Sequence, residues 1–105
     1  PWLKQRAQTD DNSDVRRAAV QELARGWKED TGMFEFLCDR ALNDSFNREY
    51  DFEFEGNPRQ TALEAIIKNY PDHPQTLTLL QDSAENDPDD KVKEFAKKKL
   101  AELDR

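Results

Sequence analysis

The sequence contains three copies of one residue pattern, with a period of 34 residues. Residues 3–7 recur as residues 37–41, with leucine, arginine and alanine in the same places. Residues 59–66 recur at the same offset as residues 93–100, with a basic residue, an alanine and a large aliphatic residue matched. A period of this length is typical of stacked repeat proteins, in which one unit is too small to bury its apolar face and packs against its neighbours.

A second offset locates an insertion in the second copy. Residues 16–27 recur as residues 59–70 at an offset of 43, which exceeds the period by 43 − 34 = 9 residues. The extra residues lie between Asp44 and Asn57, so we assign the insertion to residues 45–56. A chain of 105 residues is long enough for one domain. We therefore expect a single domain over residues 1–105, with repeats at about 1–28, 31–70 and 72–104.

Within each copy, apolar residues recur at helical spacing, as in Val15, Ala19 and Leu23. Asn57-Pro58 and Asp87-Pro88 each supply a capping side chain followed by a proline suited to a first helical turn. These signals predict six helices, at about 2–9, 12–27, 31–43, 57–70, 74–86 and 88–103. The predicted fold class is all-α, an α-solenoid of three helix pairs.

The two ends of the predicted array differ. Val20 aligns with Leu63 and then with Lys97, so the third copy replaces an apolar position by a charge. This change predicts that the last helix is a solvated C-terminal cap. The first helix begins with Trp2-Leu3 and has no such cap, and the chain starts at Pro1. We therefore expect the chain to be the C-terminal part of a longer protein.

The composition restricts the classes of partner. The chain is 37% charged and 35% hydrophobic, with a formal net charge of −7 and no basic block. Such a chain is poorly suited to nucleic acid phosphates or to anionic membranes, so we expect neither as a partner. It has no apolar run long enough to span a membrane and no signal-peptide pattern, and we expect it to be cytoplasmic.

The turns and helix starts resemble those of HEAT repeats. In that family a turn aspartate stands five residues before a Val-Arg pair, and here Asp10 precedes Val15-Arg16 while Asp87 precedes Val92-Lys93. The middle copy departs from this pattern, because the insertion separates Asp44 from Pro58-Arg59. The resemblance implies a ladder of ion pairs between turn aspartates and the basic residues of neighbouring repeats, formed by Arg16, Arg59 and Lys93.

Residues 15–28 and 70–77 are also similar to HEAT segments that end large cyanobacterial NACHT-type NTPases. This similarity implies a non-catalytic scaffold or sensor region that binds a protein partner. HEAT-like bilin lyases, which handle a chromophore, and a purely structural spacer remain as alternatives. The sequence itself has no Gly-rich phosphate loop and no nucleophile–base pair, so it predicts no enzyme activity, cofactor or metal.

The second helix of each pair lines the concave face of a HEAT array, by resemblance. Polar residues recur four apart on its solvent side and predict a partner-binding ridge, whose candidates are Arg17, Gln21, Arg25, Glu64 and Lys68. The third copy continues the ridge with Glu94, Lys98 and Glu102. The alternative is a solvated face held by Glu64–Lys68 and Glu94–Lys98 ion pairs.

The insertion holds a second set of candidates. Its aromatic residues are Phe46, Tyr50, Phe52 and Phe54, and from Tyr50 onward they alternate with acidic residues. One interpretation is a segment that binds another protein. The chain would then be a monomer or a weak dimer that forms through the insertion. The other is a loop whose aromatic residues pack inward.

Cys38 and His73 are the single cysteine and the single histidine. One cysteine excludes an internal disulfide, and so few nitrogen and sulfur ligands leave little metal chemistry. We interpret Cys38 as an unreactive, half-exposed thiol and His73 as a solvated turn residue.

Overall fold

The computed structural model describes residues 2–47 and 57–103, and these residues form six α-helices and no strand. The helices are α1 (Trp2–Thr9), α2 (Ser13–Gly26), α3 (Met33–Asn43), α4 (Pro58–Asn69), α5 (Pro74–Asn86) and α6 (Asp90–Leu103). The all-α prediction is confirmed, and each predicted helix is present within a few residues of its expected bounds. None of the described helices is long and apolar enough to cross a membrane.

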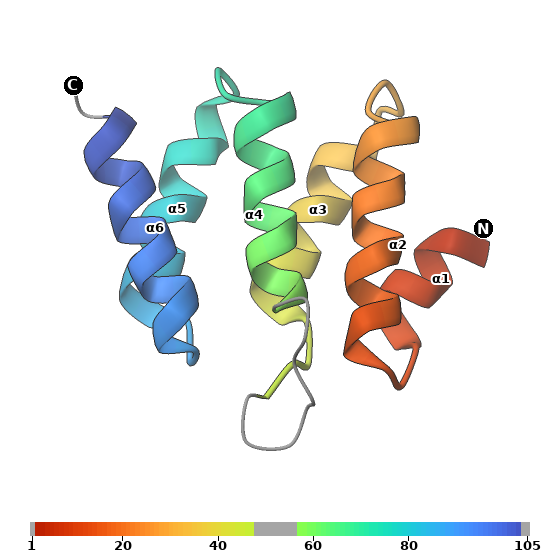
Figure 1. Cartoon of the computed structure of the whole chain (residues 1–105). Coiled ribbons are helices and arrows are strands. Elements are labelled where there is room, and N and C mark those ends of the chain that lie inside the picture. Colours follow the sequence, from red (N-terminus) through yellow and green to blue (C-terminus); the bar gives the residue numbers. More distant parts are fainter. Residues whose placement is uncertain (1, 48–56, 104–105) are drawn as a thin grey trace.

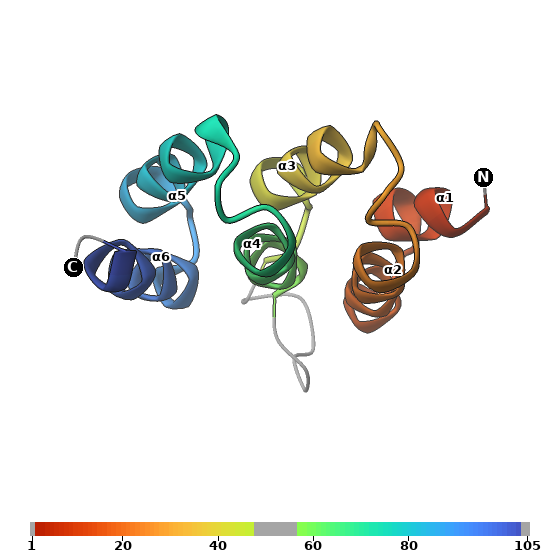
Figure 2. The ribbon, with the colours of Figure 1, turned by 90° about the horizontal axis from the view of Figure 1, so that it is seen from above.

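Successive helices pair as α1 with α2, α3 with α4 and α5 with α6 (Figure 1). The pairs lie side by side, with α2 packed against α4. Figure 2 shows two layers, in which α1, α3 and α5 follow the outer side of a gentle curve while α2, α4 and α6 lie on its inner side. The turns at Asp10, Asp44 and Asp87 therefore lie at the same end of the molecule, and the α2–α3 and α4–α5 turns lie at the other (Figure 1).

One continuous apolar core runs between the two layers. Its fully buried side chains come from every helix pair and include Ala7, Val20, Leu37, Leu63, Ile66, Leu80 and Val92. These residues recur at helical spacing, so each helix turns one apolar stripe toward the other layer. The small residues Ala19, Ala62 and Ala96, which share one register position, let the inner helices lie close to the outer layer.

Several helices begin at a local side-chain cap, whereas α3 begins after Gly32 with no side-chain cap. Asn12 accepts hydrogen bonds from the backbone N–H groups of Asp14 and Val15, and Asn57 accepts one from that of Arg59. The prediction that Asp87 caps the last helix, with Pro88 in its first turn, is wrong. Helix α6 begins two residues later, where the Asp89 carboxylate accepts from the Lys91 N–H at 3.0 Å. The Asp87 carboxylate is instead bound to Arg59 of the preceding pair.

The interpretation of His73 as a solvated residue is also wrong. Its imidazole is half-buried and stacks on the ring of Phe34, with the ring centroids 3.6 Å apart. Its Nδ1 accepts a hydrogen bond from the Gln75 N–H at 3.1 Å, so His73 caps α5. The side chain thus joins the α4–α5 turn to the start of α3.

Cys38 is half-buried in α3 and packs against the core. Burial, together with the negative charge of Glu35, raises the pKa of its thiol from 9.0 to about 11. Because the thiolate is the reactive form, we expect the native chain at about pH 8 to react with a disulfide reagent about a hundredfold more slowly than an unshifted thiol. The absorbance of the released aromatic thiolate measures the rate. The same chain in urea is the control, and equal native and denatured rates would contradict the prediction.

Candidate protein-binding groove

Two arginines join the helix pairs at the end of the molecule that holds the aspartate turns. Arg16 donates from Nε and Nη2 to the Asp44 carboxylate at 3.0 and 3.2 Å, and Arg59 binds the Asp87 carboxylate in the same way at 2.9 and 3.1 Å. Both pairs are buried and both span 28 residues of sequence. The predicted ladder is therefore present at Arg16 and Arg59, whereas Lys93, its third predicted member, makes no ion pair among the described residues.

Each ladder arginine also binds the turn of its own pair. The Nη1 of Arg16 donates to the carbonyl of Asp10 at 2.7 Å, and that of Arg59 donates to the carbonyl of Asp44 at 2.7 Å. Each arginine thus donates two hydrogen bonds to one carboxylate and a third to a backbone carbonyl. The planar guanidinium group allows this bidentate pairing, whereas the ammonium group of lysine does not. Since these side chains are buried and fully engaged, the ladder is a structural element and no binding surface.

A groove opens on the inner face between α2 and α4. It has a volume of about 350 Å³ and is lined by Gln21, Ala24, Arg25, Lys28, Thr61, Glu64, Ala65, Lys68 and Asn69. Four of the predicted ridge residues, Gln21, Arg25, Glu64 and Lys68, thus come together around one hollow. The small side chains Ala24, Thr61 and Ala65 leave the space, and the longer polar side chains border it.

Two hydrogen bonds hold the walls of the groove at one end. The Asn69 side chain donates to the carbonyl of Ala24 at 2.9 Å, and the Tyr70 hydroxyl donates to the carbonyl of Lys28 at 2.8 Å. Burial first, then the charges of Glu29 and Asp30, raise the pKa of the Tyr70 phenol, so the hydroxyl stays a donor at neutral pH. The spacing of α2 and α4 is therefore set by direct contacts, and the groove is already formed in the free chain.

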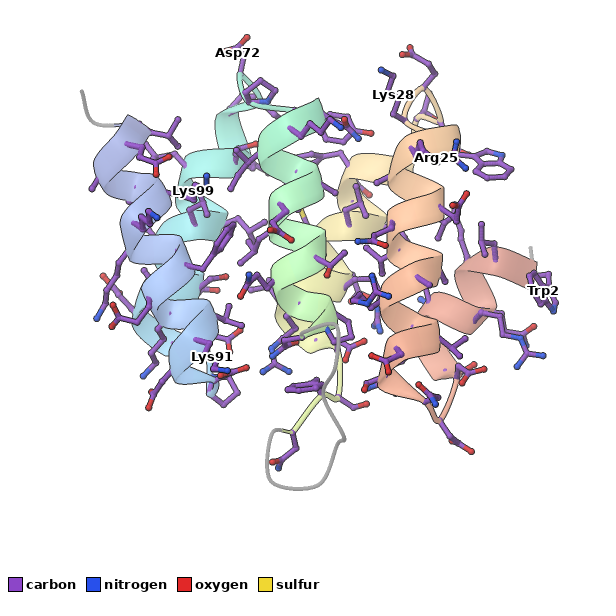
Figure 3. All side chains as sticks on the ribbon, in the orientation of Figure 1. Trp2, Arg25, Lys28, Asp72, Lys91 and Lys99 are labelled. Carbon is purple, nitrogen blue, oxygen red and sulfur yellow. The ribbon has the colours of Figure 1, made fainter. Side chains whose placement is uncertain are left out.

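The groove has an excess of positive charge although the chain as a whole is acidic. Arg25, Lys28 and Lys68 face a single carboxylate, Glu64, among its lining residues. Arg25 is paired with Glu22 on the same helix, whereas the expected Glu64–Lys68 ion pair is not formed among the described residues. Figure 3 shows Arg25 in the last turn of α2 and Lys28 in the turn that follows it, at the same end of the molecule. The arrangement suits a partner segment that carries carboxylates.

Other predicted candidates lie elsewhere. Arg17 is half-buried, does not line the groove, and donates to Gln21 at 2.7 Å. Phe46 is only 4% exposed, so it does not present a binding surface and follows the inward-packing alternative. Tyr50, Phe52 and Phe54 lie outside the described residues. Glu94, Lys98 and Glu102 are exposed on α6 and do not line the groove, and the expected Glu94–Lys98 pair is absent from the described part of the chain.

Sequence reasoning missed the floor and one end of the groove. Ala24, Ala65 and Thr61 carry no polarity pattern that distinguishes them from core positions, and Lys28 stands in a turn outside the helical register. At the repeat offset, Asn69 and Tyr70 align with Gly26 and Trp27, which stand where one helix pair ends and the next begins. This alignment is the one sequence signal that indicates contacts at this end of the groove.

Within residues 2–47 and 57–103, no group of three or more histidine, cysteine, aspartate or glutamate side chains is placed to hold a metal ion. Comparisons with protein-family models, with curated proteins and with solved structures found no match to this chain.

Proposed function

We propose that this chain is a non-catalytic protein-interaction module built from three HEAT-like helix pairs. Its binding site is the groove between α2 and α4, and its ligand is an extended segment of a partner protein that carries acidic side chains. The repeat assignment is supported by the two Arg–Asp pairs of identical geometry and identical separation of 28 residues. The groove, in which Lys28 and Lys68 make no ion pair among the described residues, is the observation that supports the binding role.

The physical properties of the groove favour a polypeptide over a compact small molecule. The groove is open to solvent and bordered by exposed polar side chains, whereas small-molecule sites are mostly enclosed and apolar. The backbone of an extended segment could lie on the small side chains of Ala24, Thr61 and Ala65. Carboxylates of the segment would then meet Lys28 and Lys68, which make no ion pair among the described residues.

A random-peptide library selected on the immobilised chain tests this proposal. We expect the selected peptides to be enriched in aspartate and glutamate. The variant Ala65→Trp fills the groove from a half-buried position and should weaken binding of these peptides at least about tenfold, a change of about 1.4 kcal/mol. Fluorescence anisotropy of a labelled peptide measures the dissociation constant.

The matched control is Glu35→Trp, which adds the same ring at an exposed position on α3, away from the groove. It should leave peptide affinity unchanged. Lys68→Glu reverses one groove charge at an exposed position and should weaken acidic peptides while sparing neutral ones. Equal binding by the wild type and Ala65→Trp would place the binding surface elsewhere and overturn the assignment of the groove.

A further inference from the structure

We propose that the outer face between α3 and α5 is a second docking site, and that its ligand is an amphipathic helix of a partner protein whose apolar stripe is flanked by lysine or arginine. This site, which we call the outer groove, is lined by Cys38 and Leu42 of α3 and by Leu79, Asp82 and Glu85 of α5, together with three neutral polar residues of α5. It has a volume of about 970 Å³. The groove between α2 and α4, which we call the inner groove, lies on the opposite face, so the outer groove goes beyond the proposed binding of acidic segments.

The curvature of the array opens the outer groove. Figure 2 shows α3 and α5 as neighbours on the outer side of the curve, where the helices of a curved stack spread apart. On the inner side α2 packs directly against α4, whereas α3 and α5 approach each other far less closely. The two walls belong to the second and third helix pairs, so the groove lies within the array and involves neither end of the chain.

The dimensions of the outer groove suit a helix of a few turns. Its lining residues on α5 extend from Gln75 to Glu85, a length of about 15 Å at the helical rise per residue. Two helices that lie side by side with a space between them form the type of groove into which a partner helix packs. Such a partner makes its contacts through apolar residues three or four positions apart.

Apolar side chains lie in the middle of the outer groove. Leu79 is only 7% exposed and forms part of the floor, and Cys38 is half-buried against the core. Leu42 stands one turn after Cys38 and is 45% exposed, which makes it one of the large apolar side chains that stay exposed in the described part of the chain. An apolar stripe on a partner helix would remove Leu42 from water, which is favourable.

Carboxylates border the outer groove without a matching cation. Asp82 and Glu85 are exposed on α5, a helix that contains no lysine, arginine or histidine. Burial first, and then the charge of Glu35, raise the pKa of the Cys38 thiol, so Glu35 adds negative charge near the wall that α3 provides. None of these three carboxylates makes an ion pair among the described residues. The one cation of α3, Arg40, is buried and already bound to a carboxylate of its own helix.

The negative charge distinguishes the outer groove from the other hollows between neighbouring helix pairs. The corresponding hollow between α1 and α3 is lined by Lys4 and has no carboxylate among its described lining residues. The inner groove has an excess of cations. Charge complementarity therefore assigns a basic ligand to the outer groove and disfavours the acidic segments proposed for the inner groove.

Two helical peptides without cysteine test the proposal on the full chain. Both carry leucines three and four positions apart, and the leucine stripe is flanked by lysines in one peptide and by glutamates in the other. We expect the lysine peptide to bind more tightly by about tenfold or more, a difference of at least about 1.4 kcal/mol. Fluorescence anisotropy of the labelled peptides measures both dissociation constants. Equal affinities, or no binding of the lysine peptide, overturn the proposal.

Reversal of the groove charges should reverse the preference. The variant Asp82→Lys/Glu85→Lys should lose the lysine peptide and gain the glutamate peptide. Both positions are exposed, so the variant should fold, and circular dichroism checks this. The matched control is Glu94→Lys/Glu102→Lys, which changes the net charge by the same amount at exposed positions of α6 outside the groove. It should keep the wild-type preference, and an equal loss of the lysine peptide in both variants would assign the attraction to net charge and overturn the proposal.

Cys38 reports where the lysine peptide binds. Because Cys38 is the single cysteine and lines the outer groove, a saturating amount of peptide should slow its reaction with a disulfide reagent. An unchanged rate would place the peptide elsewhere and overturn the proposal. Leu42→Ser should weaken the lysine peptide by about tenfold, whereas Leu77→Ser, at a position of α5 that is 50% exposed but outside the groove, should not. Ala65→Trp, which fills the inner groove, should leave this affinity unchanged, so the two sites can fail independently.

Discussion

Replacing Arg59 by methionine should destabilise the chain by about 3–5 kcal/mol, a large part of the stability of a small domain. The Arg59 and Asp87 side chains are only 4% and 3% exposed, so the substitution leaves a carboxylate in the interior without its cation. It also removes the donors to the carbonyls of Asp44 and Phe46 at 2.7 and 3.0 Å. Urea denaturation followed by circular dichroism measures the loss, and in the extreme case the variant is unfolded in buffer.

The control for this substitution is Arg25→Met, because the Arg25 side chain is 75% exposed and, among the described residues, forms an ion pair only with Glu22 of its own helix. Its effect should stay within about 0.5 kcal/mol. The double variant Arg59→Met/Asp87→Leu should be more stable than Arg59→Met alone, since it removes the unpaired carboxylate as well. A loss below about 1 kcal/mol for Arg59→Met would show that the ladder does not hold the pairs together.

Replacing Phe46 by alanine should cost about 3 kcal/mol, as expected for a buried ring. Phe46 follows the ladder residue Asp44 directly after α3, and its side chain is 4% exposed. Its backbone N–H donates to the Asp44 carboxylate at 2.9 Å, and its carbonyl accepts from Arg59, so the ring anchors the segment that both arginines use. Urea denaturation again gives the free energy of unfolding.

Leu42→Ala is the comparison for Phe46→Ala, because Leu42 lies on the same side of the insertion but is 45% exposed. It should change stability by less than about 0.5 kcal/mol. Phe46→Leu keeps most of the apolar volume and should cost about 1 kcal/mol. If Phe46→Ala is as stable as the wild type, the aromatic ring has another role and the binding interpretation of Phe46 is restored.

The helices were predictable because they depend on local and periodic information, and the ladder was implied by the resemblance to HEAT repeats. Apolar spacing and asparagine caps act within a few residues, so the helix positions followed from the sequence. The resemblance to HEAT repeats implied a ladder that involves Arg16, Arg59 and Lys93, and the structure forms it as the Arg16–Asp44 and Arg59–Asp87 pairs.

The groove required the tertiary structure. Its depth depends on how closely α2 approaches α4, which the Asn69 and Tyr70 contacts decide across more than 40 residues of sequence. Contacts between neighbouring helix pairs also explain why the predictions for Asp87 and His73 were wrong. A local rule assigned Asp87 to a helix cap and His73 to solvent, whereas an arginine and a phenylalanine of the neighbouring pair bind them.

The sequence by itself determined that the chain is all-helical and that it contains three copies of one residue pattern. These properties repeat along the chain, so each copy supports the inference from the others. Only the tertiary structure decided which polar side chains surround a common hollow, that Phe46 is buried, and which apolar residues remain exposed. Burial and proximity depend on distances between helices, and these distances are set by packing across the whole array rather than by any one segment.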